Sequence, residues 1–187
     1  MSSKGETAMA AKSKTIFIRR ASPEDARVLS TMGGLTFTQS YASIIPAEEL
    51  TSYTSRAFSL EQMGAELGAA EITYLLALVK TRPCGYSKLA PTPPPPAVGD
   101  AKSVELTRLY VLPEWIGKGI GTMLIEKSLD AALEAGHDSC WLRVWEGNDR
   151  AIEFYRRGGF RPVGSEPYHV GRCSETVLLM IRDLSQN

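Results

Sequence analysis

Three glycines at alternate positions, Gly117, Gly119 and Gly121, stand between an apolar stretch and an amphipathic one. The stretch from Val104 to Val111 predicts a strand, and Ile120 to Ala135 carries apolar residues at helical spacing, which predicts a helix lying on a sheet. Glycines in a turn before a helix let backbone amides converge on an anion. The helix N-terminus adds free N–H groups and about half a positive charge. The turn therefore predicts a binding site for a phosphate-bearing cofactor.

The spacing of this turn excludes two common phosphate-binding loops. A P-loop needs Gly-Lys-Ser/Thr after four spacer residues, and a dinucleotide-binding turn needs a glycine where this chain has Thr122. Neither pattern is met, so the cofactor belongs to another class of phosphate-bearing molecule.

The remaining residue patterns predict a strand-rich α/β chain. Ser22-Pro23-Glu24-Asp25 is expected to begin a helix that runs to Met32 and is broken by Gly33-Gly34. Helical pieces are expected from Phe37 through Leu67, over the substrate entrance. The other predicted elements are strands at 15–19, 72–80, 84–89, 140–145, 160–163 and 176–182 and a helix at 149–158. Together they predict a mixed sheet of about seven strands flanked by helices.

The length of 187 residues, of which 43% are hydrophobic, fits one globular domain, expected at 15–187. Residues 1–14 lack the apolar core of a secretory signal peptide and are expected to be a disordered tail. The Pro-rich stretch 91–102 includes four consecutive prolines, which cannot supply ladder hydrogen bonds. It is expected to be an exposed connector between strands, the alternative being a peptide-docking motif.

Charge and cysteine usage exclude several classes of function. The 21 Lys and Arg balance the 21 Asp and Glu, so the basic excess that drives binding to nucleic acid or anionic lipid is lacking. No apolar run approaches the roughly 20 residues of a membrane span. The three cysteines and two histidines show no metal-ligand spacing. We expect a cytoplasmic protein without a metal, which acts on a small molecule or a protein.

The glycine turn, preceded by Glu105-Leu-Thr-Arg-Leu-Tyr-Val111, resembles the acetyl-CoA motif of the GNAT superfamily of N-acetyltransferases. Asn148-x-x-Ala151-x-x-Phe154-Tyr155-x-x-x-Gly159-Phe160 is similar to the second cofactor motif of that superfamily. The resemblance covers Cys84 to Leu184. It implies a GNAT-like α/β (α+β) fold with a mostly antiparallel central sheet, and transfer of an acetyl group from acetyl-CoA to an amine.

Two features qualify the resemblance. Ile116 stands where the family usually has Arg or Gln at the start of the glycine loop, which predicts weaker cofactor binding. In the amino-terminal half, Phe37-Thr-Gln-Ser-Tyr41, Pro46-Ala-Glu-Glu-Leu50 and Phe58-Ser-Leu-Glu-Gln62 are similar to the branch that includes bacterial polyamine acetyltransferases.

The resemblance also implies how the cofactor is held. The end of the strand at Val111 would splay from Cys140 to Trp145, so that free backbone groups bind the pantetheine arm and one amide stabilises an oxyanion. Asn148 would contact the cofactor, cap its helix, or both. The residues assigned to cofactor binding are Leu109, Tyr110, Val111, Gly117, Lys118, Gly119, Ile120, Gly121, Thr122 and Asn148.

Two side chains are candidates for the chemistry. Tyr155 is the candidate general acid, since its hydroxyl can protonate the departing coenzyme A thiolate; the alternative is a packing role beside Phe154. Glu105 is the candidate base for the acceptor amine; the alternative is a solvent-facing strand residue. Cys140, in an apolar strand with no cationic partner in the sequence, is not expected to act as a nucleophile.

These expectations combine into direct attack by the amine on acetyl-CoA in a ternary complex. The rival hypothesis is a catalytically silent acyl-CoA-binding or regulatory domain, which Ile116 favours. Polyamine, amino acid, antibiotic, small aromatic amine and protein amino terminus all stay open as acceptors. A homodimer is expected because family members often dimerise.

Overall fold

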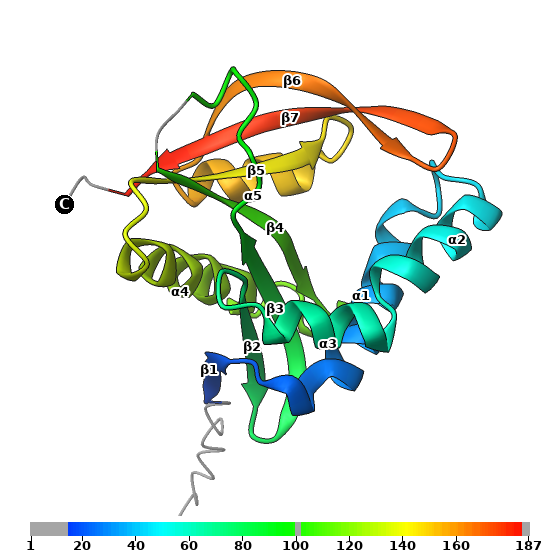
Figure 1. Ribbon diagram of the computed structural model, residues 1–187, viewed down its shortest axis with the longest axis vertical. Helices are drawn as coiled ribbons and strands as arrows, with labels where there is room; N and C mark the ends of the chain where they lie inside the picture. Colours follow the sequence, from blue (N-terminus) through cyan, green and yellow to red (C-terminus); the bar gives the residue numbers. More distant parts are fainter. Residues whose placement is uncertain (1–14, 100–101, 185–187) are drawn as a thin grey trace, which may run out of the picture.

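A seven-stranded sheet organises the computed structural model, which describes residues 15–99 and 102–184 (Figure 1). The strand order is β1-β2-β3-β4-β5-β7-β6, and of the described pairs β4 with β5 is parallel and the others are antiparallel. The predicted mixed, mostly antiparallel sheet is therefore confirmed. The strands are Ile16–Arg20 (β1), Thr73–Val79 (β2), Arg82–Ala90 (β3), Ser103–Val111 (β4), Ser139–Trp145 (β5), Arg161–Val170 (β6) and Cys173–Asp183 (β7).

Helices cover both faces of the sheet, which explains why β2 is an almost continuous apolar run. Leu75 and Ala77 pack with α4 on one face, whereas Tyr74 and Leu76 pack with α1 and α3 on the other. Successive side chains of a strand point to opposite faces, so a strand buried on both must be apolar throughout. The helices are Ala26–Tyr41 (α1), Ala47–Ala57 (α2), Leu60–Gly68 (α3), Ile120–Glu134 (α4) and Asp149–Arg157 (α5).

The predicted break at Gly33-Gly34 is wrong, because α1 continues through both glycines to Tyr41. A Cβ atom on Gly33 would lie 2.4 Å from a ring carbon of Phe58 and 2.6 Å from the hydroxyl of Tyr86. Glycine is needed there for close packing between distant segments. The cost of a glycine inside a helix is only about 1 kcal/mol, which this packing offsets.

The last two strands are longer than the sequence predicts. They form a hairpin paired from Arg161↔Ile181 to Val170↔Cys173. β6 is an edge strand, where prolines such as Pro162 and Pro167 are tolerated because one row of N–H groups needs no partner. Figure 1 shows that the end of the hairpin that carries the turn reaches toward α2.

The expected exposed connector at 91–102 is partly anchored in the core, which corrects the prediction. Residues 91–99 form no strand or helix, but Val98 is only 8% exposed and packs with Trp141, Leu179 and Ile181. Residues 100 and 101 of the connector and the predicted tail at 1–14 lie outside the described residues. Within the described ranges, no helix has the length and apolar character required to cross a bilayer.

Candidate active site

The parallel strands β4 and β5 part in the middle of the sheet. They pair from Ser103↔Ser139 to Glu105↔Trp141 and no further, whereas the other edge of β4 stays paired with β3 as far as Val111. The edge of β4 that faces β5 therefore carries backbone groups without a strand partner from Leu106 onward. The expected splaying of this strand is present.

A cleft of about 580 Å³ opens beside the parted strands. It is bounded by the end of β4, the glycine turn, one face of α5 and one face of α1. Of the predicted cofactor residues, it is lined by Leu109, Tyr110, Val111, Gly117, Gly119, Gly121, Thr122 and Asn148.

The glycine turn presents free amides to this cleft. Gly117 and Gly119 have φ values of +78° and +82°, in the left-handed region that favours glycine, and their Cα atoms face open space. Gly119 is the N-cap of α4 and no side chain caps that helix end, so the first N–H groups of α4 point outward unpaired. A Cβ on Gly121 would lie 3.0 Å from the ring of Phe154, so this glycine allows α4 and α5 to approach. The turn fits a phosphate group.

Lys118 and Ile120 are the two predicted cofactor residues whose side chains do not line the cleft. Ile120 is buried with Leu124 in the core beneath the turn. The Lys118 ammonium donates a hydrogen bond to the carbonyl of Glu114 and lies 4.9 Å from the centre of the Trp115 ring. Both residues therefore offer the cleft only their backbone.

Two arginines that sequence reasoning missed line the cleft, Arg150 and Arg157 on α5. They lie seven residues apart, about two helical turns, and so share a face. Asn148 caps this helix, its Oδ1 accepting a hydrogen bond from the Ala151 amide at 3.1 Å. The seven-residue spacing of these two arginines in the predicted helix could have revealed this positively charged face from the sequence. It supplies positive charge beside Ile116, which is 43% exposed and carries none.

Tyr155 follows Phe154 on α5, and Phe154 forms part of the cleft wall. Its ring packs against Phe154 and Phe160 at centroid distances of 5.4 and 5.8 Å. It does not line the cleft, whereas Phe154 does. Burial raises the pKa of the Tyr155 hydroxyl, and among the described residues this hydroxyl has no hydrogen-bond partner.

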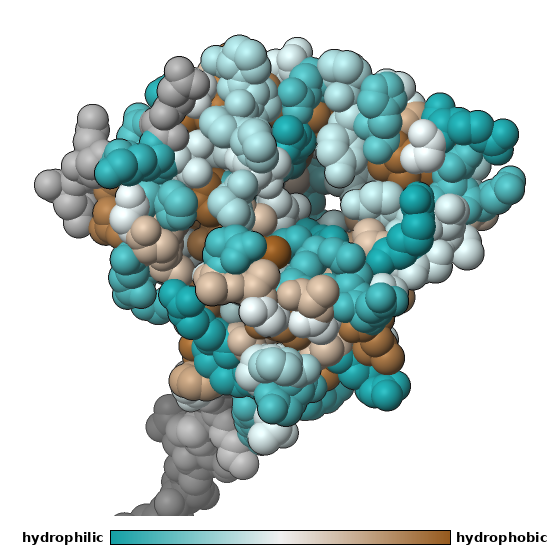
Figure 2. Space-filling model, viewed as in Figure 1, coloured by the Kyte–Doolittle hydropathy of each residue, from teal (hydrophilic) through white to brown (hydrophobic). Residues whose placement is uncertain are grey.

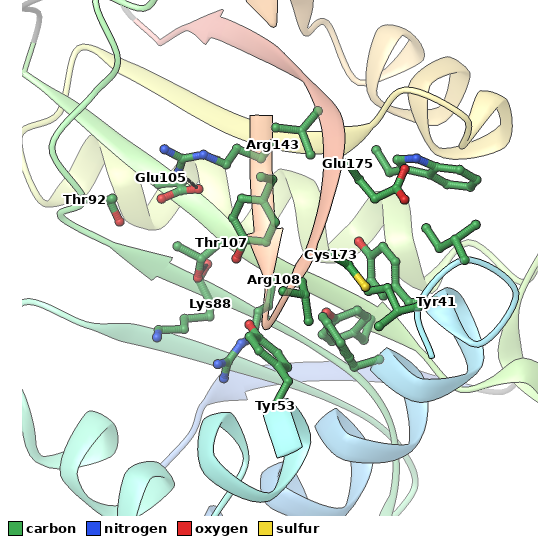
Figure 3. A pocket seen from close by; sticks show the side chains of 18 residues that line it. Tyr41, Tyr53, Lys88, Thr92, Glu105, Thr107, Arg108, Arg143, Cys173 and Glu175 are labelled. Carbon is green, nitrogen blue, oxygen red and sulfur yellow. Dashed lines mark hydrogen bonds and ion pairs between the residues drawn. The ribbon is translucent and has the colours of Figure 1, made fainter. Parts of the chain in front are cut away.

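A second cavity lies across Tyr110 from the cleft and measures about 420 Å³ (Figure 3). It is named the acceptor pocket after the role that we propose for it. It is enclosed by α1, α2, the strands β3 to β5 and the β6–β7 hairpin. Arg172 lies in the turn between β6 and β7 and donates a hydrogen bond to Glu49 of α2 at 2.8 Å, so the hairpin and α2 are joined. Figure 2 shows a hollow in this part of the molecule. Aromatic lining residues are Phe37, Tyr41, Tyr53, Tyr110, Trp145 and Tyr168, and charged ones are Lys88, Glu105, Arg108, Arg143 and Glu175.

Glu105 lines the acceptor pocket and is 5% exposed, so the solvent-facing alternative for this residue is wrong. Its Oε1 accepts a hydrogen bond from Arg143 at 2.6 Å, and the Nε of Arg143 donates to Glu166 at the same distance. The sequence could not place this carboxylate, because its partner lies on a different strand.

Of the three cysteines, Cys173 lines the acceptor pocket. Cys140 is buried and lines neither cavity, and burial raises its pKa to about 12, so its thiol stays protonated. Within 15–99 and 102–184, histidine, cysteine and carboxylate side chains form no group of three that could hold a metal ion. His169 lines neither cavity, although its neighbour Tyr168 lines the acceptor pocket.

Comparisons with known proteins agree with this architecture. The profile described as the acetyltransferase (GNAT) family matches residues 39–160. An uncharacterized N-acetyltransferase of Mycobacterium tuberculosis is 29% identical over 160 residues, which cover 86% of this chain and 98% of the relative. A spermidine N(1)-acetyltransferase of Thermoplasma acidophilum is 27% identical over 151 residues, which cover 79% of this chain and 89% of that protein.

The fold is shared with solved structures. The crystal structure of the PaiA N-acetyltransferase from Thermoplasma acidophilum in complex with coenzyme A superposes with a TM-score of 0.71 at 24% identity, covering 90% of this chain and 99% of that one. Because the family profile spans well over half of the sequence, the chain belongs to the acetyltransferase (GNAT) family and is an acetyl-CoA-dependent N-acetyltransferase.

Proposed function

We propose that the chain transfers the acetyl group of acetyl-CoA to the primary amine of a small molecule or protein, by direct attack within a ternary complex. One observation carries this proposal: the cofactor cleft and the acceptor pocket share Tyr110 and meet where β4 and β5 part. Two substrates bound in these cavities would bring their reacting groups together at that point. Positioning of this kind supplies much of the acceleration in bimolecular reactions.

Acetyl-CoA supplies an acetyl group activated as a thioester. The amides of the glycine turn and the N-terminus of α4 would hold its pyrophosphate, assisted by the charges of Arg150 and Arg157. The open edge of β4 would bind the pantetheine arm through backbone hydrogen bonds. The arm then leads the thioester toward Tyr110 and the acceptor pocket.

The transfer needs three proton movements, two from the amine nitrogen and one to the departing sulfur, and Glu105 and Tyr155 are the candidate groups. An amine with a pKa near 10 must first lose a proton, and Glu105 accepts it directly or through water. The nitrogen lone pair attacks the carbonyl carbon, while a backbone amide of β4 stabilises the negative charge that develops on the carbonyl oxygen. The C–S bond then breaks with its electron pair going to sulfur, and Tyr155 donates the proton that completes the thiol. The second proton of the attacking nitrogen, released as the amide forms, returns to the Tyr155 oxygen directly or through water.

The acceptor pocket holds a second carboxylate that could serve as the base. Glu175 lines the pocket and forms no ion pair with any described residue, whereas Glu105 is held by Arg143. Substitution of each to glutamine separates the two assignments. The homodimer and the cytoplasmic location expected from the sequence stay predictions.

Calorimetric titration with acetyl-CoA, followed by thiol release against a panel of amines in the same sample, tests the proposal. Spermidine heads the panel because one relative is a spermidine acetyltransferase. We expect saturable binding and amine-dependent release. Binding without release on any amine would favour a silent acyl-CoA-binding domain, and absence of binding would overturn the proposal altogether.

A further inference from the structure

Two cations and one carboxylate form a buried cluster at one side of the acceptor pocket. Lys88 and Arg108 are paired across β3 and β4. The Lys88 ammonium lies 2.8 Å from one oxygen of Glu66, and the Arg108 guanidinium lies 3.6 Å from the other. The three side chains are between 9% and 11% exposed. The cluster therefore has two positive charges and one negative charge. The excess positive charge is buried, where an unpaired charge is unfavourable.

Holding α3 against the sheet does not require both cations. Although burial raises the pKa of Glu66, hydrogen bonds from Lys88, Tyr74 and Gln62 hold this pKa below its ordinary value. These three donors already occupy the carboxylate. Arg108 makes only the longer contact with Glu66. Its guanidinium also donates hydrogen bonds to the Tyr74 hydroxyl at 3.0 Å and to the Ala57 carbonyl at 3.2 Å, and it stacks 4.4 Å over the ring of Phe58. Both cations line the acceptor pocket.

The opposite side of the pocket has the reverse charge. Glu105 and Glu166 share Arg143, and Glu175 forms no ion pair with a described residue. Figure 3 shows Lys88 and Arg108 on one side and Glu105, Arg143 and Glu175 on the other. The pocket is therefore dipolar. An acceptor that carries only positive charges, such as a polyamine, would meet like charge at Lys88 and Arg108.

We propose that the acceptor is an amine that also bears a carboxylate, and that Lys88 and Arg108 bind this carboxylate. The inference rests on the proposed amine acetylation and narrows its substrate class. The ammonium group of such an acceptor faces Glu105 and Glu175 before it is deprotonated, and its carboxylate neutralises the excess charge of the buried cluster. Aromatic side chains such as Tyr41 and Tyr53 line the pocket and suit an apolar body joining the two charged groups.

Matched pairs of amines that differ only by a carboxylate test the proposal. The pairs are lysine and cadaverine, ornithine and putrescine, phenylalanine and phenethylamine, and tryptophan and tryptamine. We expect kcat/KM for the acid of at least one pair to exceed that of its decarboxylated partner by about tenfold to a hundredfold, the range of a hydrogen-bonded charge. In Lys88→Met the preference for the acid over its decarboxylated partner should fall to about threefold or less.

Lys127→Met is the matched control, since Lys127 is an exposed residue of α4 paired with Asp130. It should keep the wild-type preference, and thermal unfolding checks that both variants are folded. If wild type favours the decarboxylated amine in every pair, the inference is overturned while acetylation stands. If the preference survives in Lys88→Met, the cationic cluster does not bind the carboxylate. If none of the amines gives thiol release, the proposed function is overturned as well. If Lys88→Met fails to fold, the wild-type preference alone decides.

Discussion

The cofactor cleft and the acceptor pocket meet at Tyr110 but are built in different ways. Most of the cleft comes from one stretch of chain, from Leu109 to Arg157, and it offers mainly backbone amides and a helix N-terminus. The pocket draws side chains from segments between Phe37 and Val177. A site made of backbone leaves a local glycine pattern in the sequence. A site made of side chains from distant segments leaves no such pattern.

Because of this difference, amino-acid substitutions should have different effects in the cleft and in the pocket. Substitutions on α4 or α5 that keep the turn intact leave the amides of the cleft in place, so the same cofactor still fits. A single substitution in the pocket changes its charge or shape directly, because each lining residue contributes its own side chain. We therefore expect variants of the cleft to affect acetyl-CoA binding alone and variants of the pocket to affect the acceptor alone.

We expect the largest effect from Tyr155→Phe. The proposed role of Tyr155 is in breaking the C–S bond and not in binding either substrate. We expect kcat to fall by about a hundredfold or more with both KM values nearly unchanged, since a general acid contributes 10²- to 10⁴-fold. Steady-state rates at saturating acetyl-CoA and amine measure this. An unchanged kcat would assign Tyr155 to packing with Phe154 and Phe160.

The pH profile adds an independent check on Tyr155. Burial raises its pKa above the ordinary value of 10.0. An acid with a raised pKa keeps its proton to higher pH, so kcat should not decline as the pH rises through about 10. A decline centred at that value in wild type, absent from Tyr155→Phe, would show that the hydroxyl is not buried during the reaction.

Glu105→Gln should affect only the acceptor side, lowering kcat/KM for the amine by about a hundredfold because a base is lost. Glu166→Gln is a close control, since Glu166 bonds to the same Arg143 at the same 2.6 Å but does not line the pocket. Loss of this partly exposed pair should change the rate by less than about threefold. Equal losses in both variants would assign Glu105 to orienting Arg143. A loss in Glu175→Gln alone would make Glu175 the base.

The sequence predicted those parts of the molecule that local chemistry determines. The glycine turn, the strand before it and the helix after it were placed within a residue or two, because each depends on near neighbours. The face of α5 that carries Arg150 and Arg157 was equally local and could have been read from helical spacing. These residues build the cofactor cleft.

Where distant segments meet, sequence reasoning failed. Gly33 predicted a helix break because its packing against Phe58 cannot be seen locally. Val98 was expected to be exposed because it lies in the Pro-rich stretch 91–102, yet it packs against Trp141. The burial of Glu105 depends on Arg143. The pocket is assembled from contacts of this kind, so its charge pattern emerged only from the fold.

Gly119→Ala sharpens the comparison on the cleft side, and Gly136→Ala is its control at the other end of α4. The two glycines have φ values of +82° and +84°, and both face open space. The added methyl group should therefore cost a similar strain in each, about 1–2 kcal/mol. Only Gly119→Ala disturbs the amides that face phosphate, so calorimetry should show acetyl-CoA binding weakened by about tenfold or more in that variant alone. Equal affinity in both would mean that the turn does not bind the cofactor.

The smallest effect is expected at two helix caps with the same hydrogen-bond pattern, from a side-chain oxygen to the amide three residues on. Asn148 accepts a hydrogen bond from the Ala151 amide at 3.1 Å, and Ser59 accepts one from the Gln62 amide at 3.0 Å. Alanine at either position should lower the free energy of unfolding by about 1 kcal/mol, measured by urea denaturation. Only Asn148 lines the cleft, so Asn148→Ala should also weaken acetyl-CoA binding, by about fivefold. If affinity is the same in both variants, Asn148 acts on α5 alone, and the cleft depends on backbone amides more completely than the motif implies.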